Sequence, residues 1–211
     1  MMRFRITYQK TEPLRYAGNL DLQKIWERYL RRAELPVAYS QGFHPQPRIQ
    51  QACPLPLGFL SHDEKIDIYL DGYEHSPEKV AKRLAAAPYP GIAITDVEVI
   101  SLGDPSLTTR VASAEYHVEF FDPVQFDDLQ ERVKQLLASP KIPRIRRGKS
   151  YDMRPLIESL EVQAGDEDGK CILAMCLAAR PGATGRPDEV LAALGFDPFD
   201  ARYTRTRLIS S

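Results

Sequence analysis

Apolar and polar residues follow two successive periodicities near the start of the chain. In residues 3–8, Phe4, Ile6 and Tyr8 alternate with polar residues, which is typical of a half-buried strand. Further on, apolar residues recur at intervals of three and four, which predicts an amphipathic helix that Pro36 ends. Asn19 precedes this stripe, and we expect it to be the N-cap. The stripe comprises Leu22, Ile25, Trp26, Tyr29, Leu30 and Ala33.

The same reasoning predicts two successive β-α-β-β-α-β units. In the first unit, further elements are expected at residues 48–52, 65–70, 76–87 (helix) and 92–100. In the second, they are expected at 113–121, 125–137 (helix), 142–147, 158–163, 171–178, 187–194 (helix) and 203–209. The predicted fold class is therefore α+β, a tandem ferredoxin-like sandwich with helices packed on antiparallel sheets. We place the subdomains at residues 1–102 and 113–211, joined by a linker at 103–112.

Composition is that of an ordinary soluble globular protein. The 211 residues are 43% hydrophobic and 27% charged, with a net charge of -1. No apolar run approaches the roughly 20 residues of a membrane span, and residues 1–8 lack the apolar core of a signal peptide. We expect a cytoplasmic protein with no membrane association. Cys53, Cys171 and Cys176 are widely spaced, which argues against a disulfide framework.

A proline-rich segment, residues 35–58, is the strongest candidate for function. It contains no acidic residue, and its prolines prevent it from being a helix or a central strand throughout. A long, stiff loop that carries aromatic and polar side chains is a common location for binding residues, although such a loop can also serve only as a packed crossover. The prolines are Pro36, Pro45, Pro47, Pro54 and Pro56.

Basic residues cluster in two places on this otherwise neutral chain. One cluster is the polar face of the helix before Pro36, and the other lies within residues 141–154. Clustered cations bind phosphates, and adjacent aromatic rings bind unpaired bases, so both clusters are candidates for RNA contact. A solvated charged face is the alternative for either one. The candidate nucleic-acid-binding residues are Arg28, Arg31, Arg32, Tyr39, Phe43, Arg48, Arg144, Arg146, Arg147 and Lys149.

Catalytic chemistry has one weak candidate. His44 lies in the proline-rich segment near Arg48 and could act as a general base on RNA, but we favour a histidine that only stacks or hydrogen-bonds. The spacing of Cys171 and Cys176 suits neither zinc nor an iron–sulfur cluster, and we assign no metal and no cofactor to the chain.

Several sequence blocks resemble the bacterial radical SAM-linked (radical SAM-associated) proteins, a domain of unknown function. The resemblance covers nearly the whole chain, and the blocks in its first half are the most specific. The blocks are NLDL at 19–22, RRA at 31–33, LPVAYSQGF at 35–43, PQPR at 45–48, PLPLG at 54–58, YDMRPLI at 151–157 and RPDEV at 186–190.

The resemblance implies a partner, because family members are fused to a radical SAM enzyme or encoded beside one. That separate enzyme would carry the iron–sulfur cluster and S-adenosylmethionine, since this chain has no C-x3-C-x2-C motif. The family usually has histidine where this chain has Asn19 and Gln46, and neither residue can titrate, which disfavours catalysis. We therefore assign Asn19 and Asp21, with Ser40 and Gly42, to fixing the loop.

Three hypotheses remain open at this point. The chain is an RNA-binding accessory or substrate-presenting partner of the radical SAM enzyme, in tRNA or rRNA modification or processing. Alternatively, it is a metal-independent RNA-cleaving or RNA-modifying enzyme with His44 as the base. In the third hypothesis it is a protein–protein adaptor for the enzyme without RNA contact.

Overall fold

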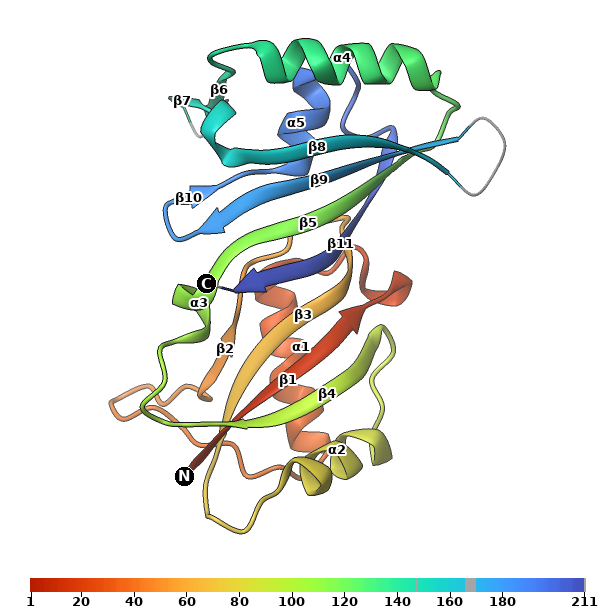
Figure 1. The fold of residues 1–211 in the computed structure, drawn as a ribbon. Coiled ribbons are helices and arrows are strands. Elements are labelled where there is room, and N and C mark those ends of the chain that lie inside the picture. The colour runs from red at the N-terminus through yellow and green to blue at the C-terminus, as the bar shows by residue number, and fades with distance from the viewer. Residues whose placement is uncertain (147, 166–169, 211) are drawn as a thin grey trace. The chain divides into compact units, whose positions relative to one another are not determined.

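The structure is a computed structural model that describes residues 1–146, 148–165 and 170–210. The chain divides into two compact units, residues 1–111 and 112–211. Each unit combines helices with a sheet of mainly antiparallel strands, so the expected α+β class is confirmed (Figure 1). Among the described residues, every helix is too short or too polar to cross a membrane.

The first unit has a four-stranded sheet in the order β2-β3-β1-β4. Every neighbouring pair in it is antiparallel. Its elements are β1 (Met2–Lys10), η1 (Glu12–Leu14), α1 (Asn19–Arg32), β2 (Ile49–Gln51), β3 (Leu60–Leu70), α2 (Pro77–Ala86), β4 (Ile92–Ile100) and α3 (Leu107–Arg110). The short helix α3 lies in the segment predicted as a linker and contacts β2 and β3.

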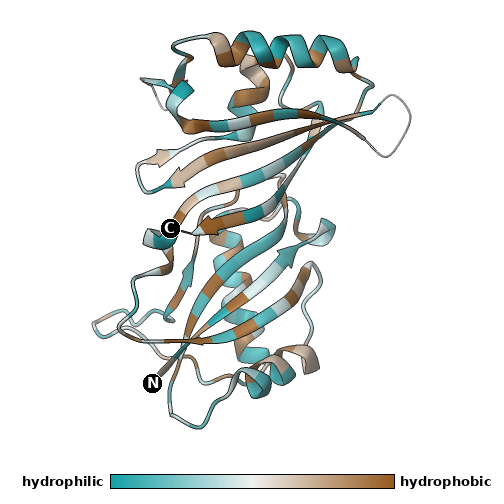
Figure 2. Cartoon of the chain, in the orientation of Figure 1, coloured by the Kyte–Doolittle hydropathy of each residue, from teal (hydrophilic) through white to brown (hydrophobic). Residues whose placement is uncertain are grey.

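The core of the first unit lies between α1, α2 and one face of the sheet. Phe4 and Ile6 of β1 stand opposite Ile68 and Ile66 of β3, and all four side chains are fully buried. Trp26 of α1 packs edge-on against the sheet at Tyr8, with ring centroids 4.9 Å apart. Alternation along the strands, which Figure 2 shows as hydrophobic and hydrophilic bands, therefore places apolar side chains under the helices.

Local interactions determine where α1 begins and ends. Gly18, not Asn19, is the N-cap, so our assignment of Asn19 as the cap was wrong by one residue. The Gly18 N–H donates to the Asp21 carboxylate at 3.3 Å, which is the return half of a capping box. At the other end, Glu34 has a φ of 54° and turns the chain away from the helix before Pro36.

The face of this sheet opposite α1 and α2 holds a buried charge network. Asp67 is fully buried and accepts hydrogen bonds from Arg3 at 2.6 and 2.9 Å and from Arg5 at 2.9 and 3.1 Å. The Arg3 guanidinium also donates to the carbonyls of Asp104 and Pro105, both at 2.9 Å. The network thus fixes β1, β3 and the segment after β4 to one another.

The second unit has β9 and β5 at the centre of its sheet. β8 pairs with one side of β9, β5 pairs with the other side, and β11 lies next to β5. The elements are β5 (Val111–Phe120), α4 (Phe126–Ala138), β6 (Pro143–Arg146), β7 (Lys149–Asp152), η2 (Arg154–Leu156), β8 (Ile157–Ala164), β9 (Cys171–Arg180), β10 (Ala183–Thr184), α5 (Pro187–Ala193) and β11 (Ala201–Ser210).

One prediction in this unit was incomplete. The short strand expected at residues 142–147 is one half of an antiparallel hairpin, β6–β7. The Asp152 carboxylate closes its base by accepting from the backbone N–H groups of Ile142 at 2.8 Å and Arg154 at 3.0 Å. These two hydrogen bonds hold the pKa of Asp152 below its usual value.

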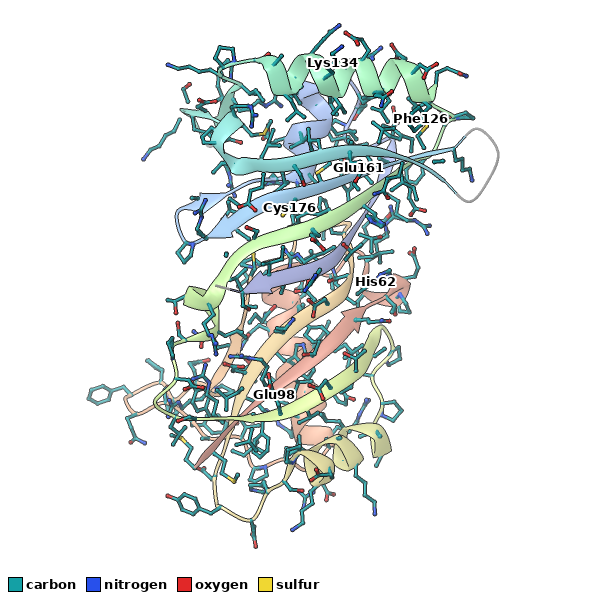
Figure 3. The ribbon with its side chains drawn as sticks, viewed as in Figure 1. His62, Glu98, Phe126, Lys134, Glu161 and Cys176 are labelled. Atoms are coloured by element: carbon teal, nitrogen blue, oxygen red, sulfur yellow. The ribbon has the colours of Figure 1, made fainter. Side chains whose placement is uncertain are left out.

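Replacing Asp67 with alanine should destabilise the first unit strongly. The change leaves two buried guanidinium groups without their counterion, which typically costs about 3–5 kcal/mol. Glu98→Gln, at the residue labelled in Figure 3, is the matched control. The Glu98 side chain is 50% exposed and lies 3.9 Å from the Arg5 guanidinium, so loss of its charge should cost less than about 1 kcal/mol. Urea unfolding of both variants measures the difference, and equal midpoints would contradict a stabilising role for the network.

Candidate nucleic-acid interface

The centre of the proline-rich segment folds back on itself as a two-stranded arm, which we define as residues 38–48. The Arg48 N–H donates to the Ala38 carbonyl and the Ser40 N–H donates to the Gln46 carbonyl, both at 2.8 Å. The Ser40 hydroxyl in turn accepts from the Gln46 N–H at 2.9 Å. The predicted loop-fixing residue Ser40 therefore lies at a closing pair of the arm, seen in Figure 1 as the loop that protrudes beside β2.

The arm joins the sheet at Tyr69 of β3. The Ala38 N–H donates to the Tyr69 carbonyl at 2.8 Å, and the Tyr69 N–H donates to the Arg48 carbonyl at 3.1 Å. The Arg48 guanidinium stacks over the Tyr69 ring, 4.1 Å from its centroid, and contacts the Met1 sulfur at 3.0 Å. Arg48, expected to bind phosphate, is thus a half-buried support for the base of the arm.

The arm displays two aromatic rings to solvent, Phe43 at its tip and Tyr39 nearer its base. Phe43 is fully exposed (102%) and Tyr39 is 49% exposed. Gly42 has a φ of 133°, which a residue with a side chain rarely adopts, so it permits the turn at the tip. His44 is exposed beside them, and within the described chain it has no hydrogen bond that would orient it as a base. An exposed ring on an ordered support is suited to stacking on an unpaired base.

The far end of the proline-rich segment is anchored independently. The buried Lys10 ammonium donates to the carbonyls of Phe59 at 3.1 Å, Ala17 at 3.0 Å and Arg15 at 3.3 Å. Arg15 and Gly58 also exchange hydrogen bonds, through a side-chain N–H at 3.1 Å and a backbone N–H at 3.0 Å. The proline-rich segment is therefore held at both ends, although its sequence lacks many backbone donors.

The basic face of α1 separates into free and engaged residues. Lys24, Arg28 and Arg31 are exposed, and within the part of the chain that the structure describes none of them forms an ion pair. Arg32 instead donates to the carbonyls of Ala87 and Pro88 and stacks on Tyr89, 5.4 Å from its ring centroid. The side chains free to bind phosphate are thus Lys24, Arg28 and Arg31.

Of the two residues assigned to loop fixing at the start of α1, Asn19 contacts the proline-rich segment, at Gln51. Asp21 is bonded to Gly18, and the Asn19 carbonyl accepts from the Gln51 side chain at 3.4 Å. The Asn19 side-chain oxygen is buried and has no hydrogen-bond partner among the described residues. Asn19 therefore connects α1 to β2 through its backbone.

The second basic cluster lies on the β6–β7 hairpin. The Arg144 guanidinium is paired with Glu189 of α5 at 2.7 Å, which compensates its charge. Arg146 and Lys149 are exposed, and Arg147 lies outside the described residues. Tyr151 of β7 lies in the same hairpin. Its pKa is raised, first by burial and then by the nearby Glu189 carboxylate. This cluster offers fewer free cations than the sequence indicated.

The sheet of the second unit carries acidic side chains on the face shared by Glu115, Glu119 and Glu161. Carboxylates repel phosphate, so this face disfavours nucleic acid.

Cys176 lies on the same face (Figure 3), and its thiol contacts Glu158 at 3.4 Å. Burial, the hydrogen bond to Glu158 and the nearby carboxylates raise the pKa of Cys176 to about 11. Among the described residues no group of His, Cys, Asp and Glu is arranged to hold a metal.

A groove that the sequence did not predict lies between α1 and the arm. Glu27 and Arg31 line one side of it, and Tyr39 and Pro47 line the other. In the sequence, Glu27 looks like an ordinary helical ion-pair partner of Arg31 four residues later. Only the path of the arm shows that both face a cavity.

Comparison with known proteins identifies a family but no activity. A family profile described as an uncharacterized protein conserved in bacteria (DUF2344) matches residues 3–187. No curated protein matches the chain.

Three solved structures are similar over nearly the whole chain, at low identity. A Cbf5-Nop10-Gar1 complex aligns over 97% of this chain and 48% of its own, at 10% identity and a TM-score of 0.53. An H/ACA RNP bound to a substrate RNA containing 2′-deoxyuridine aligns over 97% and 47%, at 11% identity and a TM-score of 0.49. An archaeal box H/ACA sRNP Nop10-Cbf5 complex aligns over 98% and 48%, at 11% identity and a TM-score of 0.48. The chain spans about half the length of these chains, and the first likeness concerns the fold alone.

The Cys176 thiol should react slowly with iodoacetamide in the folded protein. Only the thiolate is nucleophilic, and a pKa of about 11 leaves roughly a hundredfold less thiolate at pH 7.5 than an ordinary cysteine has. Peptide mass spectrometry after timed labelling should show a rate that keeps rising to about pH 11. Glu158→Gln should increase the rate at pH 8, and a wild-type rate that levels off below pH 9 would contradict this electrostatic account.

Proposed function

The chain belongs to the uncharacterized bacterial family DUF2344, and from that premise we propose that it is an RNA-binding accessory protein that presents RNA to a separate radical SAM enzyme. One observation carries the RNA part of the proposal. Tyr39 of the arm and Arg31, one of the unpaired cations of α1, line the same groove in the first unit, and Phe43 of the arm is fully exposed. Phosphate-binding cations next to exposed rings are the combination that binds RNA with unpaired nucleotides.

We further infer that each unit is a ferredoxin-like domain. In the first unit α1 joins β1 to β2, with β3 between them, and α2 joins β3 to β4, with β1 between them. In the second, α4 and the β6–β7 hairpin join β5 to β8 across β9, and α5 joins β9 to β11 across β5. Both orders are the split β-α-β arrangement. Such folds serve many functions, so the proposed function rests on the arm and not on the fold.

The charge distribution supports a localised contact. The net charge is only -1, which disfavours general coating of nucleic acid. Arg28 and Arg31 would bind phosphates while Tyr39 and Phe43 stack on bases. In the second unit, Arg146 and Lys149 of the β6–β7 hairpin would supply a further contact, because both are exposed cations.

The radical SAM enzyme is the proposed protein partner. The motifs NLDL, LPVAYSQGF and PLPLG support it through their likeness to radical SAM-linked proteins. That enzyme would hold the iron–sulfur cluster and S-adenosylmethionine, and this chain would hold the RNA. His44 has no described partner to position it, so general-base catalysis has no specific support here.

Retention of total bacterial RNA by the purified chain tests the proposal. Binding should be measured at roughly 50 and 200 mM salt, where several phosphate contacts cost orders of magnitude in affinity. Specific RNA species that remain bound at the higher concentration would support RNA presentation. No retention at the lower concentration would exclude it and leave the arm as a protein-binding element, as in an adaptor for the enzyme.

Arg28→Ala and Arg31→Ala should each weaken RNA binding and reduce the slope of log K against log salt by about one, since each removes one phosphate contact. Lys82→Ala is the matched control, because Lys82 is an exposed cation on α2 that does not line the groove. Its slope should equal that of the wild type. Filter binding across a salt series measures all three, and unchanged slopes in both arginine variants would remove α1 from the interface.

A further inference from the structure

The groove between α1 and the arm is a small, two-sided cavity. Its volume is about 240 Å³, below the range of roughly 300–1,000 Å³ for drug-sized ligands, so it suits one planar group. Tyr39 and Pro47 pair across the arm in an isolated bridge, which places both side chains on the same face. Together they form a flat apolar wall. Leu35 and Val37 add apolar side chains to the lining.

The opposite wall of the groove carries one negative and one positive side chain. Glu27 and Arg31 lie one helical turn apart on α1 and both line the cavity. This spacing and order favour a helical ion pair, yet none joins them among the described residues. A half-buried carboxylate and a guanidinium are therefore both available to a guest molecule.

A nucleotide has chemical groups that match both walls of the groove. Its base would stack on Tyr39, and its phosphate would bind Arg31. Glu27 can only accept hydrogen bonds when ionised, so it selects a base edge that donates. Guanine presents two adjacent N–H donors on its Watson–Crick edge, which match the two carboxylate oxygens. Adenine and cytosine place a ring acceptor beside their amino group, and uracil flanks its single N–H with two carbonyls.

We propose that the groove between α1 and the arm binds one unpaired guanine of a single-stranded RNA, with Glu27 reading its donor edge, Tyr39 stacking on the ring and Arg31 binding the adjacent phosphate. This inference rests on the proposed RNA-binding function and adds a specificity to it. A guanidinium side chain of a partner protein could also stack on Tyr39 and pair with Glu27. Arg31 disfavours that guest, because it repels a cation and attracts a phosphate.

The test compares short RNAs that differ at one base. Fluorescence anisotropy at about 50 mM salt would measure binding of an octamer of uridine and of the same octamer with a single central guanosine, adenosine or cytidine. A bidentate contact to one base gives about tenfold discrimination or more. The guanosine octamer should therefore bind about tenfold more tightly than the uridine octamer.

Variants assign the preference to the groove. Glu27→Gln should reduce the guanosine-to-uridine ratio to about one, because an amide places a donor against the donors of guanine. Glu74→Gln, an exposed carboxylate outside the groove, should keep the ratio. Tyr39→Ala should weaken binding of the guanosine octamer about tenfold, whereas Tyr39→Phe should retain it, since stacking needs only the ring.

The outcomes separate this inference from the function on which it rests. Octamers that all bind equally, or a guanosine preference that survives Glu27→Gln, would overturn the guanine site and leave RNA binding intact. No binding of any octamer, or of cellular RNA, would remove both. Glu27-dependent binding of a fluorescent arginine-glycine peptide by a chain that ignores RNA would assign the groove to a protein partner and also overturn the inference.

Discussion

The hydrogen bonds between the arm and Tyr69 fix the part of the molecule on which its proposed function depends. Ala38 and Arg48 each exchange a backbone hydrogen bond with this single residue of β3, and the Arg48 guanidinium covers its ring at 4.1 Å. A segment rich in proline has few donors with which to hold its own shape. Its direction is therefore set by the sheet, which lets Phe43 stay fully exposed on an ordered support.

Charge is used in two different ways in the first unit. Where cations are buried, as with Arg3 and Arg5 around Asp67 or Lys10 among carbonyls, they join distant segments of the chain. Where cations are exposed and unpaired, as with Arg28 and Arg31, they remain available to an anionic partner. The distinction matters because a count of basic residues in the sequence does not separate the two groups.

The sequence predicted periodic elements well and contacts between distant residues poorly. The strand at Ile92–Ile100 and the apolar stripe of α1 follow from local periodicity, because burial of one face selects those residues directly. The pairing of residues 38–48 did not follow, since it depends on a strand some 20 residues further on. Arg32 and Arg48 were predicted to bind phosphate because their contacts with distant residues could not be seen in the sequence. In the structure, the Arg32 guanidinium stacks on Tyr89 and the Arg48 guanidinium stacks on Tyr69. Glu27 was missed because only the arm turns that face of α1 into a groove.

The most direct test of the central claim is zero-length ultraviolet crosslinking of the purified chain to bacterial RNA, with the crosslinked peptides mapped by mass spectrometry. Zero-length crosslinking joins a base only to a side chain in direct contact with it, so rings that stack on bases are reported by the peptides that carry them. We expect crosslinks within the arm, at Tyr39 and Phe43. Crosslinks confined to the second unit, or RNA that binds without any crosslink to the arm, would contradict the assignment of the arm as the RNA-binding element.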